Sequence, residues 1–307
     1  MRVIAALSSS IRRHRTAFAS GILCLALGWP ALTGGSEAVA QSAGETDGHA
    51  KTLIARVRAN LEKERRLLLE YAYRERRRPI KVSPLGRVSI DADQTFDVFP
   101  SSDPDRPRRV LVAVDGRPPT ADERQSVARR QDRDAESRTS AAERERRNAQ
   151  RRRRAQERLE DAFRVFRFEA AGEAVLNGVR TNMVRVLPRP EAPTRSDVGR
   201  WLKKFTGTAW VSVADDELVQ LDLTATDTIS LGWGVIGRIG AGTKIHYERR
   251  RTPDGVWLPA SARFDARGRT LLFRAFAVES VTEWFDYRPY TSASENTTSD
   301  RPVSSQP

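Results

Sequence analysis

The chain has 307 residues, with 53 Lys and Arg against 40 Asp and Glu, a single cysteine and a formal net charge of +13 at pH 7. That cysteine, Cys24, lies in the N-terminal apolar stretch, so the rest of the chain has no thiol for a disulfide, a nucleophile or a metal site. The basic balance favours polyanions as partners, and nucleic acid would be the first of these in the cytoplasm.

The N-terminus has the pattern of a secretion signal. Arginines at positions 2, 12, 13 and 15 precede an apolar run from Ala17 to Leu27, and Ala38-Val39-Ala40 offers the small residues that a signal peptidase requires. This run is well short of the roughly 20 apolar residues that span a bilayer. We therefore expect cleavage after Ala40 and export to the periplasm, with an uncleaved anchor as the alternative. Arg12-Arg13 also permits a twin-arginine signal, but Arg15 favours ordinary secretion.

Export changes the polyanions that the chain would meet. Removal of residues 1–40 lowers the net charge from +13 by three, so the exported chain stays strongly basic. Phospholipid headgroups, lipopolysaccharide and acidic proteins then become the anionic partners, and nucleic acid is not expected. Arginine suits phosphate and carboxylate because its planar fork binds them in a bidentate way. A solvated basic surface without a partner is the alternative.

The first elements of the exported chain are a helix and three strands. Residues 41–50 are polar and read as a disordered linker, whereas apolar residues recur at helical spacing from about residue 51 to 69. Strands are expected from Tyr71, over 88–99 and over 109–114, with a turn at 84–86. Because Pro79 cannot donate to a ladder, it predicts that the strand from Tyr71 lies at a sheet edge.

The segment 120–162 is different in composition. Thr120 with Glu123 and Ser140 with Glu143 form capping boxes, which predict helices over about 121–138 and 141–162. Apolar residues are sparse before Leu159, so these helices form a charged, protruding insertion rather than part of the core. We expect the run of four arginines to contact an anionic partner; its members are Arg151, Arg152, Arg153 and Arg154.

Antiparallel strands dominate the remainder, up to about residue 290. Asn177-Gly178 is a strong hairpin signal, a second hairpin is expected around Asp215-Asp216, and further strands cover 244–250, 256–265 and 270–287. Residues 291–307 form a polar tail that we expect to be disordered. The sequence therefore predicts an α+β fold, a curved antiparallel sheet with helices on one face, in one domain spanning 51–290.

No motif for catalysis, metal binding or a cofactor emerges from the sequence. His246 has no partner at ligand spacing, and Asp215-Asp216 is better explained by turn chemistry. Asp222 and Asp227 would need a positioned partner to act as acid or base. We therefore expect a non-enzymatic protein without a metal or cofactor; a hydrolase would require His246 beside a buried carboxylate and a serine.

Apolar and aromatic residues gather in the C-terminal half. Most of them would fill the core between sheet and helices. The loop 231–242 differs, because its apolar residues stand in a glycine-rich, mobile segment, which suits a lid or a membrane contact. The candidate residues for an apolar trough and its lid are Trp210, Leu221, Leu223, Trp233, Val235, Ile236, Ile239, Phe273 and Phe276.

Several short motifs occur in a familiar order. They are Gly207 to Val211 (GTAWV), the hairpin at Asp215-Asp216, Asp254-Gly255, Trp257-Leu258-Pro259 and the closing strand from Phe285 to Tyr290. With a signal peptide, a helix and paired strands before them, this arrangement resembles the periplasmic outer-membrane lipoprotein-sorting proteins of the LolA and LolB half-barrel type, whose fold the RseB-like sigma-factor regulators share. The resemblance covers about residues 50–115 and 163–290.

The resemblance implies an incomplete antiparallel barrel whose mouth is closed by helices and whose apolar concavity holds acyl chains. The insertion at 121–162 has no counterpart in that pattern, and no site residue is carried over from the family. Our main expectation is a carrier that binds lipid or lipoprotein acyl chains without catalysis. The alternative is a periplasmic sensor or adaptor that binds a protein through the arginine-rich helices.

Overall fold

The computed structural model describes residues 52–64, 66–82, 88–101, 107–135, 141–231, 237–270 and 275–290. The expected signal peptide, the linker and the C-terminal tail lie outside these ranges. The described part of the chain begins with helical residues 52–64 and 66–67. The elements after them are β1 (Tyr71–Arg77), β2 (Ile80–Val82), β3 (Val88–Ile90), β4 (Gln94–Phe99), β5 (Arg108–Val114), α4 (Ala121–Ala135), α5 (Ala141–Arg164), β6 (Phe166–Leu176), β7 (Val179–Pro188), α6 (Asp197–Leu202), β8 (Phe205–Ser212), β9 (Leu218–Ala225), β10 (Ile229–Leu231), β11 (Gly237–Ile239), β12 (Lys244–Arg251), β13 (Trp257–Thr270) and β14 (Ala275–Pro289).

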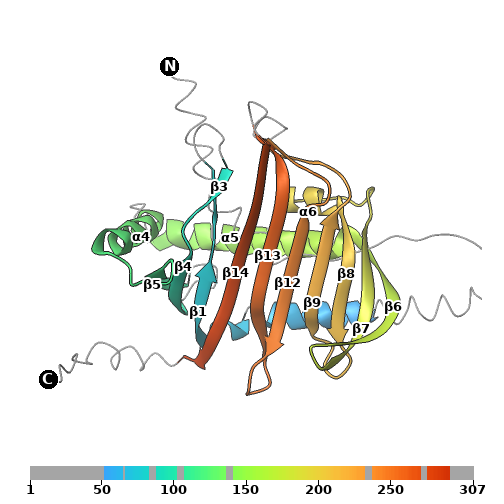
Figure 1. Cartoon of the computed structure of the whole chain (residues 1–307). Coiled ribbons are helices and arrows are strands. Elements are labelled where there is room, and N and C mark those ends of the chain that lie inside the picture. The colour runs from blue at the N-terminus through green and yellow to red at the C-terminus, as the bar shows by residue number, and fades with distance from the viewer. Residues whose placement is uncertain are drawn as a thin grey trace, which may run out of the picture.

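One large antiparallel sheet organises the described chain, which confirms the predicted α+β class. Ten of its strands follow the order β5-β4-β1-β14-β13-β12-β9-β8-β7-β6, while β10 pairs with β11 and β11 with β13 (Figure 1). The end strands β5 and β6 do not pair with each other, and the sheet is neither closed nor strongly curled. A small second sheet, formed by β2 and β3, lies against β14.

The N-terminal strands join the C-terminal one. Strand β1 pairs with β14 on one side, from Tyr71 opposite Pro289, and with β4 on the other. The prediction that Pro79 places this strand at a sheet edge is therefore wrong. Pro79 lies beyond Arg77, the last residue of β1, so its missing N–H interrupts no ladder.

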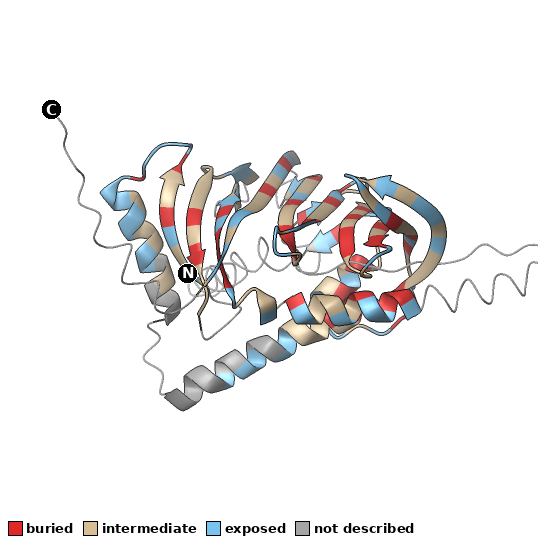
Figure 2. Cartoon of the chain, turned by 90° about the horizontal axis from the view of Figure 1, so that it is seen from below, coloured by how far each residue is buried: buried red, intermediate tan, exposed pale blue. Residues whose placement is uncertain are grey.

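Helices cover only one face of the sheet. The helix at 52–64 and α5 both run across the strands on the same side (Figures 1 and 2), while the other face carries no helix in the described chain. Burial therefore alternates along the strands. In β9, Leu221, Leu223 and Ala225 are buried, and the residues between them are only partly buried. We call the helix-covered side the inner face and the other side the outer face.

Two hydrophobic clusters lie on the inner face. The larger one packs the helix at 52–64, α5 and α6 onto the strands from β6 to β14, and includes Val57, Leu159 and Leu202. The smaller one lies under β1, β4 and β5 at the other end of the sheet. Its buried members are Tyr73, Phe96, Val98, Leu111 and Val114. The core is thus divided along the sheet rather than continuous.

The charged insertion consists of α4 and α5. The capping box at the start of α4 is formed, since the backbone N–H of Glu123 donates to Thr120 Oγ1 and that of Thr120 to Glu123 Oε2, at 3.2 and 2.8 Å. Helix α4 lies beside the edge strand β5, where Gln131 Nε2 donates to the carbonyl oxygen of Arg109 at 2.9 Å. No helix of the described chain is long and apolar enough to span a bilayer.

Candidate functional site

Partly buried aromatic side chains line the inner face where the two clusters approach each other. Tyr247, Phe264 and Phe276 pack against the larger cluster. Trp284 and Tyr287 pack against the smaller one. The strand registers place them on one face of β12, β13 and β14, because Tyr247 lies opposite Ala262, Phe264 opposite Ser280 and Trp284 opposite Glu75. We call these five residues the aromatic seam.

A buried arginine connects the helix at 52–64 to the sheet beside the seam. The Arg249 side chain is 1% exposed, and its Nε lies 2.7 Å from Glu64 Oε2 while its Nη1 lies 2.6 Å from Glu217 Oε2. Its Nη2 also donates to the carbonyl oxygen of Trp257 at 2.9 Å. Burial raises the pKa of Glu64, and the nearby charge of Glu217 adds to this, although Arg249 opposes it. One guanidinium thus holds a helix carboxylate against two strands and the β8–β9 turn.

A second buried carboxylate lies on the other side of the seam. Glu75 binds Arg109 in a bidentate way, with Nε–Oε1 and Nη2–Oε2 distances of 3.2 and 3.1 Å. Burial acts against the charged form of Glu75, but Arg109 and Arg77 outweigh it and lower its pKa, and the Trp284 side chain also donates to it. The Arg77 guanidinium stacks over the Phe96 ring, 4.6 Å from its centroid. The seam is therefore apolar with ionic groups on both sides.

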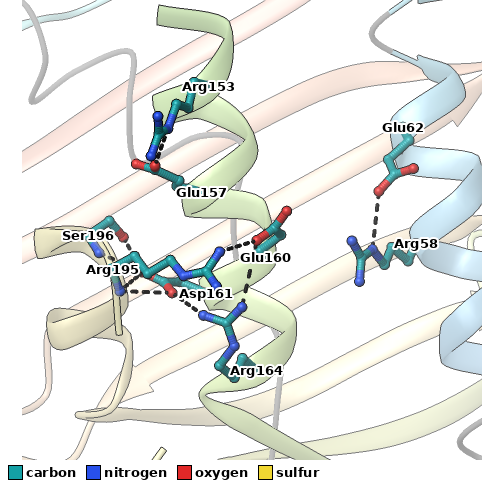
Figure 3. A network of polar contacts seen from close by, with 9 residues as sticks. All are labelled: Arg58, Glu62, Arg153, Glu157, Glu160, Asp161, Arg164, Arg195 and Ser196. Carbon is teal, nitrogen blue, oxygen red and sulfur yellow. Dashed lines mark hydrogen bonds and ion pairs between the residues drawn. The ribbon is translucent and has the colours of Figure 1, made fainter. Parts of the chain in front are cut away.

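Polar contacts also fix α5 where it crosses the inner face (Figure 3). Asp161 is fully buried and accepts from the backbone N–H groups of Arg195 and Ser196 at 2.9 and 2.7 Å, and from Ser196 Oγ at 2.6 Å. Arg164 Nη1 forms an ion pair with Asp161 Oδ1 at 3.0 Å. Gly199 in α6 approaches so closely that an added Cβ would lie 2.6 Å from Asp161 Oδ2. Asp161 thus locks the short helix α6 to the C-terminal part of α5.

The predicted trough residues fall into three groups. Leu221, Leu223 and Ile239 are buried in the larger cluster, with Ile239 on strand β11 rather than in a loop, and Phe276 belongs to the seam. Trp210 pairs with Gln220, so it lies on the outer face, partly buried. The remaining residues lie outside the described chain: Trp233, Val235, Ile236 and Phe273.

The four predicted anion-contact residues all lie on α5. Arg153 and Arg154 are exposed, and Arg153 forms an ion pair with Glu157 one turn later at 3.0 Å. The side chains of Arg151 and Arg152 lie outside the described part of the structure. The structure does not bring these arginines together with the seam residues through any contact among the described side chains.

The histidine of β12 is paired with a carboxylate on the outer face. His246 Nδ1 lies 2.6 Å from Asp222 Oδ1, and this hydrogen bond raises the pKa of His246. Gln220 Nε2 holds the other Asp222 oxygen at 2.7 Å. The Asp222 side chain is 42% exposed, unlike the buried carboxylate that a hydrolase of this kind was expected to need. Among the described residues, no group of three or more His, Cys, Asp or Glu side chains is placed to hold a metal ion.

Sequence reasoning missed Glu64, Arg249 and most of the seam. Glu64 and Arg249 occupy positions that, by the pattern of the helix at 52–64 and of strand β12, would be expected to hold apolar side chains. Glu64 continues the helical series Leu53, Val57 and Leu61, and Arg249 continues the inward alternation of β12. A charged residue at an apolar position of each of two elements is the signal that could have found this pair.

No protein-family model matches the sequence, and no curated protein matches it. Solved structures that align with it include a DUF1329 family protein from Desulfovibrio piger, at 11% identity and a TM-score of 0.27, over 77% of this chain and 94% of that one. An outer membrane lipoprotein-sorting protein domain from Vibrio parahaemolyticus aligns at 10% identity and a TM-score of 0.26, over 76% and 93%. MucB, in a complex with MucA(peri), aligns at 10% identity and a TM-score of 0.21, over 79% of this chain and 100% of that one. TM-scores this low do not establish a shared fold, so the proposal below rests on contacts within this chain.

Proposed function

We propose that this chain is an exported, non-enzymatic protein that binds the acyl chains of lipids or lipoproteins on the inner face of its sheet, at the aromatic seam. In this proposal residues 51–290 form one domain, an open antiparallel sheet with helices on one face, with the segment 120–162 inserted into it. The resemblance of the sequence to lipoprotein-sorting proteins and its N-terminal signal pattern support this role. The observation that carries it is the seam itself, five partly buried aromatic residues between two separate clusters.

The energetics of an acyl chain suit such a surface. Each buried CH₂ group contributes about 0.8 kcal/mol, so ten of them contribute roughly 8 kcal/mol. A carrier must also release its cargo, and an open sheet face covered by separate helices can be uncovered without unfolding the sheet. The helix at 52–64 contacts the strands through side chains such as Leu53 and Glu64, so its displacement from the inner face would break the ion pair between Glu64 and Arg249.

A matched pair of substitutions tests the proposal. Phe264 lies in the seam, whereas Phe285 lies on the outer face opposite Arg74 and is 36% exposed. Phe264→Gln should weaken the uptake of a fluorescent long-chain fatty acid by about 10- to 100-fold, as expected from the roughly 1.5–3 kcal/mol of one buried aromatic side chain. Phe285→Gln should leave uptake unchanged. Thermal unfolding of both variants checks that the fold persists.

Native mass spectrometry of the protein recovered from cells provides a second readout. Co-purified lipid is expected on the wild-type chain and on Phe285→Gln, and less of it on Phe264→Gln. If the wild-type chain carries no lipid and takes up no fatty acid, the acyl-binding proposal is wrong.

The second candidate function is a sensor or adaptor that binds an acidic protein through α4 and α5. The exposure of Arg146, Arg153 and Arg154 favours it, as does the absence of buried side chains in the described part of α5 before Leu159. Replacing these three arginines by glutamine should then abolish capture of the partner protein while fatty-acid uptake stays intact. Loss of uptake in the same variant would contradict the division of roles.

A further inference from the structure

The two ionic clusters beside the aromatic seam differ in their balance of charge. Glu75 contacts two guanidinium groups, that of Arg109 at 3.1 Å and that of Arg77 at 3.3 Å, and one carboxylate can neutralise only one of them. In the other cluster, the single guanidinium group of Arg249 contacts two carboxylates. The first set of contacts therefore has a formal excess of positive charge, and the second has no such excess. We call the first set the positive cluster; its members are Glu75, Arg77 and Arg109.

The strand registers place the two clusters at opposite ends of one row across the inner face. Tyr247, whose side chain hydrogen-bonds to Glu64, lies opposite Ala262. Ala262 lies opposite Thr282, which in turn lies opposite Arg77. Neighbouring strands are about 4.8 Å apart, so roughly 14 Å of sheet separates Tyr247 from Arg77. The seam therefore has the positive cluster at one end only.

The guanidinium group of Arg109 has an edge that Glu75 does not use. Arg109 lies on the inner face, opposite the buried Val98, and donates to Glu75 through Nε and Nη2 at 3.2 and 3.1 Å. No acceptor within the described ranges engages its Nη1, so the Nη1–Nη2 edge keeps donors for a second anion. The side chains of Arg109 and Arg77 are 25% and 30% exposed, whereas that of Glu75 is 5% exposed. An anion that arrives from solvent therefore meets the guanidinium groups first.

Apolar side chains adjoin the positive cluster on the same face. Glu75 lies opposite Phe96 on β4 and opposite Trp284 on β14. Phe96 is buried, Trp284 is partly buried, and the Arg77 guanidinium stacks over the Phe96 ring. A molecule held by the guanidinium groups would therefore have its apolar part in contact with the seam.

We propose that the positive cluster binds the headgroup of an anionic amphiphile, a carboxylate or a phosphate, while the acyl chain lies along the seam toward Tyr247. Arginine binds both kinds of headgroup in a bidentate way. This inference rests on acyl binding at the seam, and it narrows the ligand to acyl chains with a negatively charged headgroup. Because the other end of the row has no excess of positive charge, such a ligand binds in one orientation.

Matched ligands separate this inference from acyl binding itself. Pyrene-labelled hexadecanoic acid is compared with pyrene-labelled hexadecanol at about pH 8, where the carboxyl group is ionised. Lysophosphatidylglycerol and lysophosphatidylcholine are compared as competitors of the acid. The wild-type chain should bind the acid about 10- to 100-fold more tightly than the alcohol, the range expected from hydrogen bonds to a charged group. Inorganic phosphate at millimolar concentration should not displace the acid, because it has no acyl chain.

Two variants should shift this preference in opposite directions. Arg77→Gln removes one guanidinium group and keeps the bidentate pair of Arg109 and Glu75, so the acid should lose most of its advantage over the alcohol. Glu75→Gln removes the carboxylate that competes with the headgroup, so the advantage should grow. Arg74→Gln is the control, since Arg74 lies on the same strand but on the outer face and is 46% exposed, and it should leave the preference unchanged. Unchanged binding of the alcohol in each variant shows that the acyl site persists.

The outcomes distinguish the two proposals. If the wild-type chain binds neither the acid nor the alcohol, the proposed acyl-binding function is wrong, and this inference fails with it. Equal binding of the acid and the alcohol, or a preference that Arg77→Gln leaves intact, overturns the headgroup site alone. Displacement of the acid by inorganic phosphate would mean a site for free anions and would also overturn it. An anionic preference in both ligand pairs supports both headgroups, and a preference in one pair identifies which headgroup binds.

Discussion

Replacement of Arg249 by methionine tests how the helix at 52–64 is held on the sheet. The Arg249 side chain is 1% exposed and lies 2.7 and 2.6 Å from the carboxylates of Glu64 and Glu217. Methionine fills a similar volume but leaves Glu64 as a buried carboxylate without its cation. Removal of one partner of a buried ion pair costs about 3–5 kcal/mol.

Urea unfolding measures this cost. With a slope of about 2–3 kcal/mol per M, the Arg249→Met midpoint should fall by roughly 1–2.5 M. The double variant Arg249→Met with Glu64→Gln should recover part of the loss, because it leaves a neutral amide in place of the unpaired charge. Limited proteolysis should cut the helix at 52–64 earlier in the single variant than in the double one.

The reasoning is refuted by either of two results. One is a cost below about 1 kcal/mol for Arg249→Met, which is the range of an exposed ion pair. The other is strict additivity of the Arg249→Met and Glu64→Gln effects, which would mean that the two side chains do not interact across the 2.7 Å contact.

Three other substitutions have defined outcomes. Asp161→Asn should cost about 1.5–3 kcal/mol, because an amide cannot accept all the donors that surround the carboxylate, while Glu160→Gln on the surface should cost less than about 1 kcal/mol in the same thermal unfolding assay. Asp222→Asn should lower the pKa of His246 in an NMR titration. In the wild type, the contribution of His246 to folding stability is fully present below its unfolded pKa of 6.5. This contribution is lost as the pH rises through the higher folded pKa. Glu75→Gln should flatten the acid limb of the stability profile, since a lowered pKa gives stability above the unfolded value of 4.5 that is lost as the pH falls through the folded one. An unshifted histidine, or an unchanged acid limb, would contradict the corresponding contact.

Local features of the fold could be predicted because their signals are local. Asn177-Gly178 forms the turn between β6 and β7 with positive φ at both residues, 51° and 81°, as the hairpin pattern requires. The start of α4 follows from its capping box, and α5 ends two residues after its predicted end. The alternation of apolar and polar residues is also a local signal, and it predicted most of the C-terminal strands.

Long-range pairing could not be predicted in this way. Nothing near Tyr71 in the sequence shows that its strand pairs with β14, more than two hundred residues later, so Pro79 suggested an edge that does not exist. The division of the core into two clusters depends on that pairing, and so does the seam. Trp210 illustrates the same point, because only the register with Gln220 decides which face it occupies.

Glu64 and Arg249 were missed because a charged residue in a sequence is normally expected to be exposed. Glu64 and Arg249 are separated by 185 positions, and each is an exception to its own apolar pattern. Each exception is visible in the sequence, but coordinates are needed to show that the two side chains form one contact.

Photo-crosslinking with a diazirine-bearing fatty acid tests the central proposal most directly. After irradiation of the wild-type protein, residue-level mass spectrometry should find the label on seam residues such as Tyr247, Phe264 and Trp284, and an excess of unlabelled fatty acid should remove it. Label confined to outer-face residues such as Trp210 and Phe285, or no competable label at all, would show that acyl chains do not bind on the inner face.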